Sequence, residues 1–120
     1  MQQNSLNQLQ EIVDTTVRTL GGYWVPLSGL ARVLEELGEL GELILKEDFG
    51  DNFTTELSDV MIITICVANQ YCADLHAPKM DSKYTAKLTL QEHYLKLAAD
   101  CGELARIVNS YEGNKKLKPT

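Results

Sequence analysis

LARVLEELGELGELIL, residues 30–45, places leucine, valine or isoleucine at intervals of three and four. This spacing is typical of one face of an α-helix, so we predict a helix from about Ser28 to Lys46. Drawn as a helical wheel, the apolar arc consists of Leu30, Val33, Leu34, Leu37, Leu40, Leu43, Ile44 and Leu45. Glu36 falls inside this arc, and Glu39 falls at its edge. Because burying a lone carboxylate costs several kcal/mol, Glu36 is expected to be paired, protonated or bound to a cation.

Similar patterns on either side of this stretch predict three more helices, at residues 5–20, 54–75 and 89–112. Ser5 with Gln8, and Thr89 with Glu92, form capping-box patterns at two of the helix starts. The alternation of period two that indicates strands is scarce. We therefore predict an all-α, four-helix bundle-like fold. It forms a single domain over residues 1–120, with a mobile tail at about 114–120.

The composition restricts the class of protein. Eleven Lys and Arg against seventeen Asp and Glu give a net charge of -6, which argues against a non-specific nucleic-acid binder. The longest apolar run, residues 60–68, is far shorter than the roughly 20 residues that cross a bilayer. The first residues lack the features of a signal peptide, and three cysteines without CxxC spacing fit reduced thiols. We expect a cytoplasmic protein that binds neither nucleic acid nor membrane.

The third predicted helix contributes two more carboxylates. Glu56 and Asp59 are three residues apart and share one face of a helix whose residues 60–67 are almost all apolar. Acidic pairs on two adjacent core helices converge on one point, where like charges repel unless a cation lies between them. An all-carboxylate set suits hard cations, so we expect Mg²⁺ or Mn²⁺. A di-iron site is disfavoured because neither histidine stands in a Glu-x-x-His pattern.

Simpler interpretations exist for the same residues. Glu35 and Glu39 are compatible with a solvent-exposed helix face, and Glu56 and Asp59 would complement a helix dipole near an N-terminus. Arg32, four residues before Glu36, offers that carboxylate a simple salt bridge. Only the combination of the acidic pairs favours a metal site.

Two motifs carry a family resemblance. Glu35-Glu36-Leu-Gly-Glu39 matches the EExxE pattern, and Glu56-Leu-Ser-Asp59 the ExxD pattern, of the MazG-like all-α nucleoside triphosphate pyrophosphohydrolases. The resemblance implies a Mg²⁺-dependent enzyme that hydrolyses an NTP or dNTP to the monophosphate and pyrophosphate. By this similarity Glu36, Glu39, Glu56 and Asp59 are the metal ligands. Glu35 is the residue expected to hold or deprotonate the attacking water.

Four further residues are candidates for substrate binding. In the family, basic residues after the third helix often meet the phosphates, and Lys79 and Lys83 occupy that segment, although they are also compatible with ordinary surface lysines. Trp24, in the loop before the second helix, could stack on a base or serve in packing. Asn69, on the apolar third helix, could read the nucleotide or satisfy a backbone group.

The third helix also predicts association. Its apolar side chains point in nearly every direction, so the helix is expected to be buried on all sides, and three other helices of one chain would cover it poorly. We expect a homodimer or homotetramer built around the second and third helices, as the resemblance also implies. The alternative is a non-catalytic helical interaction or regulatory module derived from the same fold. A hydrolase of modified nucleotides is a third interpretation.

Overall fold

The computed structural model describes residues 5–75 and 87–113. These residues form four helices and no strand: α1 (Ser5–Thr19), α2 (Pro26–Leu45), α3 (Asp51–Gln70) and α5 (Leu90–Glu112). The predicted all-α fold is therefore confirmed for the described part of the chain. No helix in these two ranges is both long and apolar enough to span a membrane. The predicted tail at residues 114–120 lies outside the described residues.

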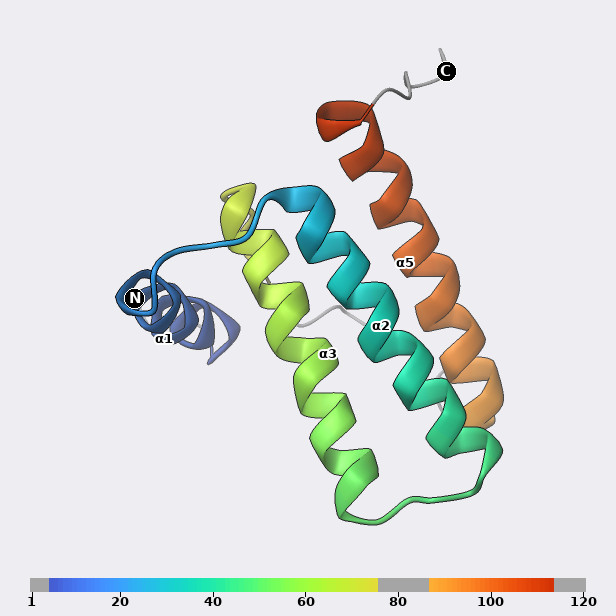
Figure 1. The fold of residues 1–120 in the computed structure, drawn as a ribbon. Coiled ribbons are helices and arrows are strands. Elements are labelled where there is room, and N and C mark those ends of the chain that lie inside the picture. Colours follow the sequence, from blue (N-terminus) through green and yellow to red (C-terminus); the bar gives the residue numbers. More distant parts are fainter. Residues whose placement is uncertain (1–4, 76–86, 114–120) are drawn as a thin grey trace.

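The helices pack in the order α1, α3, α2, α5 (Figure 1). The central pair, α2 and α3, is antiparallel and joined by the short loop 46–50, while α5 runs along the other side of α2. The outer helices α1 and α5, both fully described, do not pack against each other. The chain is thus more open than a closed four-helix bundle, and the α2–α3 pair is its centre.

The end of α3 differs from the sequence prediction, which continued the helix to about Leu75. The helix stops at Gln70 because Cys72 adopts a left-handed conformation, with φ of 54°. The Ala73 N–H then donates to the Ala68 carbonyl at 2.9 Å, which closes a Schellman motif. Glycine usually marks this position, and no glycine stands here, so the end of the helix could not be recognised from a glycine.

The starts of α2 and α3 also fall earlier than predicted. Pro26 is the first residue of α2, a position where its fixed φ suits the helix and its missing N–H costs nothing. The sequence prediction placed this start at Ser28. Gly50 is the N-cap of α3, and Asp51 supplies a negative charge to the first turn. The predicted capping box between Thr89 and Glu92 is confirmed at the start of α5.

The contact between α2 and α5 depends on a missing side chain. Gly41 faces Tyr94, and a Cβ on Gly41 would lie 2.5 Å from the tyrosine hydroxyl oxygen. That hydroxyl donates to the Leu37 carbonyl at 2.8 Å. Tyr94 also packs on the buried cluster of Leu40, Ile44 and Val60 together with Phe53 and Leu97. Gly41 therefore allows α5 to approach α2 closely.

Several apolar side chains that the sequence placed in the core are exposed in the single chain. On α3, Met61 is 46% and Ile62 48% exposed, so a single chain does not bury this helix on all sides. On α2, Leu34 and Leu45 are also exposed, because they lie on the side of the apolar arc that turns away from the buried residues. The expectation that one chain covers α3 poorly is confirmed.

We predict that Gly41→Ala lowers the free energy of unfolding by about 1–2 kcal/mol, because the new methyl group displaces Tyr94 and breaks its hydrogen bond. Urea denaturation measures this change. Gly102→Ala is the matched control. It lies within α5 with no atom near its Cβ position, so it should raise stability by roughly 0.5–1 kcal/mol. Equal effects of the two substitutions would contradict the close contact.

Candidate functional site

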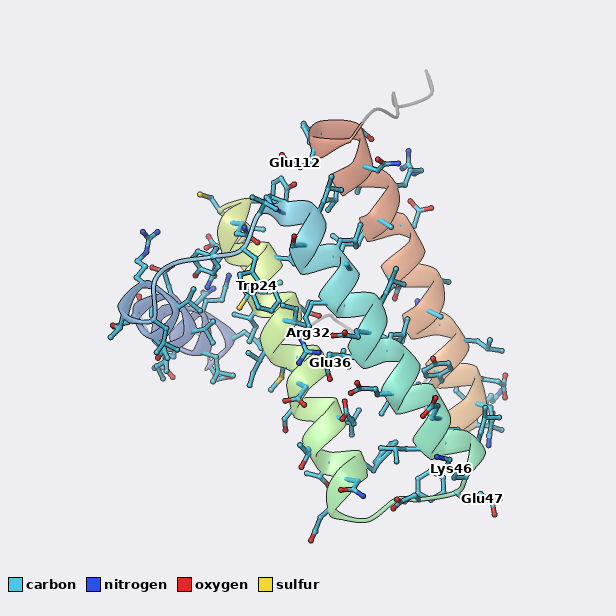
Figure 2. All side chains as sticks on the ribbon, viewed as in Figure 1. Trp24, Arg32, Glu36, Lys46, Glu47 and Glu112 are labelled. Atoms are coloured by element: carbon cyan, nitrogen blue, oxygen red, sulfur yellow. The ribbon has the colours of Figure 1, made fainter. Side chains whose placement is uncertain are left out.

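Glu36 is the most deeply buried charged side chain among the described residues, with 2% of its surface exposed. Its Oε1 forms an ion pair with Arg32, one turn earlier on α2 (Figure 2). Its Oε2 is also buried, and no donor in residues 5–75 or 87–113 reaches it. The salt bridge considered from the sequence therefore exists, but it satisfies only one of the two oxygens. The other oxygen still needs a proton, a donor or a cation.

Two carboxylates of α3 meet Glu36 at this point. Glu36, Glu56 and Asp59 each offer one oxygen, and these oxygens all lie within 4.8 Å of one another. The packing of α2 against α3 brings them together, because Glu56 and Asp59 share the face of α3 that meets α2. We call these three residues the acidic cluster. It contains three of the four metal ligands that the sequence indicated.

The pKa of Glu56 is raised to about 7, far above its ordinary value of 4.5. The largest cause is contact with the Glu36 carboxyl group, followed by burial and by contact with Glu39. Two facing carboxylates have no hydrogen between them unless one is protonated, so the Glu36 carboxyl group opposes ionisation of Glu56. Glu39 thus lies against Glu56 on the exposed side of the acidic cluster, outside the three-residue group.

These residues fit a divalent cation. The donor set consists only of carboxylate oxygens, which hard cations prefer. Glu36 Oε2 and Glu56 Oε2 are both buried without a donor in the described ranges, so a cation between them would supply the missing partner. A positive charge would also remove the repulsion that raises the pKa of Glu56. The acidic cluster could therefore bind a metal ion.

Glu35, the predicted catalytic residue, is exposed and lies beside this site. Arg32 bonds to it as well as to Glu36, so one guanidinium joins the two neighbouring carboxylates. Hydrogen bonding to Glu35 is the largest cause of a raised pKa for Arg32. The outward direction of Glu35 follows from the helix, since adjacent residues are turned by about 100°.

A family model for the MazG nucleotide pyrophosphohydrolase domain matches residues 25–89, more than half of the chain. The chain belongs to the MazG family. The matched region includes the whole of α2 and α3, and with them the acidic cluster. The family that the two acidic motifs indicated is thereby confirmed. No curated protein and no solved structure matched the chain.

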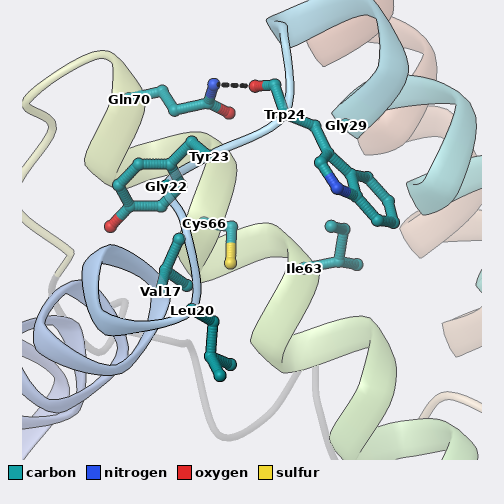
Figure 3. Close-up of a pocket in the computed structure, with 9 residues that line it drawn as sticks. All are labelled: Val17, Leu20, Gly22, Tyr23, Trp24, Gly29, Ile63, Cys66 and Gln70. Carbon is teal, nitrogen blue, oxygen red and sulfur yellow. Dashed lines mark hydrogen bonds between the residues drawn. The ribbon is translucent and has the colours of Figure 1, made fainter.

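A cavity of about 280 Å³ lies beside the acidic cluster of this MazG domain (Figure 3). Its walls come from α1, α2, α3 and the loop before α2, and its lining residues are Val17, Leu20, Gly22, Tyr23, Trp24, Gly29, Ile63, Cys66 and Gln70. Ile63 also lines a smaller hollow with Glu36 and Asp59. The apolar cavity and the acidic cluster are therefore neighbours that share one wall residue. Trp24, predicted to stack on a base, is 60% exposed at this cavity.

Asn69 takes part in a polar junction between α1 and α3. Its amide group donates to the Gln10 carbonyl and to the Tyr23 hydroxyl, each at 3.1 Å, and its carbonyl oxygen accepts from the Gln10 side chain at 3.0 Å. Tyr23 in turn donates to Asp14. Asn69 lines a hollow with Gln10 and Asp14, and it is not among the residues that line the Trp24 cavity. The structure thus brings Asn69 to α1 and not to the acidic cluster.

Gln10 is a buried polar residue of this junction that the sequence analysis missed. It is 8% exposed, and its side chain also donates to the Ala73 carbonyl at 2.7 Å. The signal was present, because Gln10 falls on the same side of its helix as Leu6 and Val17. Lys79 and Lys83 lie outside the described residues, so the structure gives no placement for them.

We predict that Glu56→Gln stabilises the metal-free MazG chain increasingly as the pH rises from about 4.5 through 7. Below 4.5 Glu56 is protonated in both the folded and the unfolded chain, and Gln resembles that form. The raised pKa contributes a stability that is present below the unfolded value of 4.5 and is lost as the pH approaches about 7. Above that pH the folded chain carries the full charge repulsion, which Gln removes.

Thermal unfolding with a chelator present, from pH 4.5 to 8, measures the difference in Tm between the variant and the natural chain. Glu103→Gln is the control, since this exposed residue on α5 pairs only with Arg106 in the described structure. Its Tm difference should stay flat across the same range. A flat difference for Glu56→Gln as well would contradict the carboxyl contact.

Proposed function

We propose that this MazG chain is a metal-dependent nucleoside triphosphate pyrophosphohydrolase, which converts an NTP or dNTP to the monophosphate and pyrophosphate. The observation that carries the proposal is the acidic cluster, with three carboxylate oxygens within 4.8 Å and two buried oxygens that lack donors in the described residues. Such an arrangement is costly for folding unless a cation uses it. The family match gives the reaction class.

Glu36, Glu56 and Asp59 would hold the cation, with Glu39 as a fourth ligand from the exposed side. Mg²⁺ is the proposed ion and Mn²⁺ the substitute, because both prefer carboxylate oxygen. A bound divalent cation neutralises phosphate charge and makes the phosphorus more open to attack. The local sign of charge is then reversed, which allows a chain with a net charge of -6 to bind a polyanion.

Glu35 would accept the proton of the attacking water. It is exposed and adjacent in sequence to Glu36, and its ion pair with Arg32 holds it at the edge of the acidic cluster. Attack of the water oxygen on the α-phosphorus breaks the bond to the oxygen that bridges the α- and β-phosphates. That oxygen leaves with pyrophosphate, and the proton taken by Glu35 is released afterwards to solvent.

The cavity beside Trp24 would receive the nucleobase. Its walls are mostly apolar, and the exposed indole offers a surface for stacking. Because Ile63 borders both hollows, a base in the cavity would leave the phosphates near the acidic cluster. Asn69 would act indirectly, through the hydroxyl of Tyr23 next to Trp24. Lys79 and Lys83 are proposed phosphate contacts from the segment after α3.

We also propose that the chain works as a homodimer or homotetramer. Leu57, Met61 and Ile62 of α3 are each more than 40% exposed, and their burial against a second copy would complete the coverage of the central helix. Light scattering coupled to size-exclusion chromatography tests this part of the proposal.

We predict that Glu36→Gln and Asp59→Asn each lower pyrophosphate release by a factor of roughly 100 or more and also abolish stabilisation by Mg²⁺. In the natural chain, Mg²⁺ at 100 times its Kd should add about 2.7 kcal/mol to the free energy of unfolding. Glu35→Gln should lower kcat but keep this stabilisation, because it removes the base and not a ligand. Pyrophosphate release is measured across a panel of NTPs, dNTPs and modified nucleotides, and stability by thermal unfolding.

Glu103→Gln on α5 is the matched control. It should change neither pyrophosphate release nor stabilisation by Mg²⁺, since it alters an exposed carboxylate outside the acidic cluster. Stabilisation by Mg²⁺ without turnover of any nucleotide would favour the non-catalytic module. Full activity in Glu36→Gln would overturn the proposed function. Loss of Mg²⁺ stabilisation in Glu35→Gln would overturn the role of Glu35 as the base and make it a metal ligand.

A further inference from the structure

One arginine connects the buried Glu36 of the acidic cluster with the exposed Glu35 at its edge. Arg32 Nη1 contacts both Glu35 and Glu36, and the side chain is 38% exposed. Of the ion pairs formed within residues 5–75 and 87–113, the pair between Arg32 and Glu36 is the one that reaches the acidic cluster. A buried carboxylate is therefore compensated by a cation that is itself partly in solvent.

Arg32 stands at the boundary between two hollows. It lines the hollow of about 130 Å³ that contains Glu36, Asp59 and Ile63. It also lines a hollow of about 380 Å³ with Trp24 and Glu35. Arg32 lies beside Glu36 on the side of α2 near Trp24 (Figure 2). A modest rotation of the guanidinium would carry it from the acidic cluster toward the side where we place the nucleotide.

We propose that Arg32 and the divalent cation are alternative counter-ions of Glu36, and that Arg32, once it leaves Glu36, binds the triphosphate. The two cations cannot both lie close to one buried carboxylate without repelling each other. Arg32 contacts Oε1 and the metal would take Oε2, which has no donor in the described residues, so the two would compete through repulsion across one carboxylate and not for one oxygen. The inference rests on the proposed function, since it assigns a triphosphate to this side of the site.

Glu35 would keep Arg32 near the site after the metal has displaced it from Glu36. Its own bond to Arg32 does not depend on Glu36, so the guanidinium would stay at the edge of the acidic cluster after the metal binds. A guanidinium presents parallel N–H donors that match two phosphate oxygens. Arg32 would thus lower metal affinity before the substrate arrives and raise the affinity for the metal–triphosphate complex.

Arg32→Gln tests this pair of opposite effects. Arg106→Gln is the matched control, because Arg106 also pairs with a glutamate three residues away, Glu103, but has no buried carboxylate beside it. Isothermal titration calorimetry measures the Kd of Mn²⁺ alone, and then the Kd of inorganic tripolyphosphate as its Mn²⁺ complex. Tripolyphosphate is chosen because it makes the result independent of the nucleobase.

We expect Arg32→Gln to bind Mn²⁺ roughly fivefold more tightly and the tripolyphosphate complex roughly tenfold more weakly than the natural chain. Arg106→Gln should change neither Kd. Unchanged or weaker Mn²⁺ binding in Arg32→Gln would overturn the exchange and leave Arg32 as a structural salt bridge. Unchanged tripolyphosphate binding would overturn the assignment to phosphate.

Arg32→Lys keeps the inference testable if the Gln variant does not fold. Lys retains the charge but lacks the paired donors, so Mn²⁺ affinity should stay near that of the natural chain while tripolyphosphate binding recovers in part. Mn²⁺ affinity that rises as strongly with Lys as with Gln would overturn the competition. Because the Mn²⁺ titration needs no turnover, it can support the competition even if no nucleotide is hydrolysed. Turnover with unchanged Mn²⁺ affinity would instead remove this inference and leave the proposed function standing.

Discussion

The contact between α2 and α3 depends on how the charge of Glu36 is compensated. A carboxylate that is 2% exposed would oppose the packing of the two central helices if it stood alone. Arg32 compensates one oxygen, and the second oxygen faces Glu56 and Asp59 across the interface. The same interface that forms the core therefore stores unfavourable electrostatic energy. A divalent cation between these carboxylates would relieve this energy, and metal binding would then be coupled to folding.

The acidic cluster lies on the two central helices and not in a surface loop. Helices α2 and α3 fix their carboxylates to rigid backbone, so little ordering is needed when a ligand arrives. The cavity beside Trp24 is attached to the same pair of helices through Gly29 and Ile63. Its other walls come from the chain before α2. The acidic cluster therefore needs only α2 and α3, whereas the apolar cavity also depends on the position of α1.

The sequence predicted the helices and the acidic cluster well, because both follow from helical periodicity. Glu36 stood out in an apolar arc, and the spacing of Glu56 and Asp59 gave their common face. Helix ends without glycine could not be found in this way, since Cys72 adopts the left-handed conformation although it is not a residue type that favours it. Nor could the direction of the Asn69 amide, which depends on contacts with α1 that are distant in sequence.

Helix α1 is attached to α3 in an unusual way. Gln10 is its one fully buried residue among those described, and the amide hydrogen bonds of Gln10 to Asn69 and Ala73 add to the packing of apolar side chains that are only half-buried. Water can replace such bonds at little net cost, whereas it cannot replace buried hydrocarbon. Among the described helices α1 alone has no fully buried apolar side chain, and it packs only against α3, so it is the helix most ready to separate by local opening. Since Val17 and Leu20 belong to the wall beside Trp24, local opening of α1 would control access to the apolar cavity.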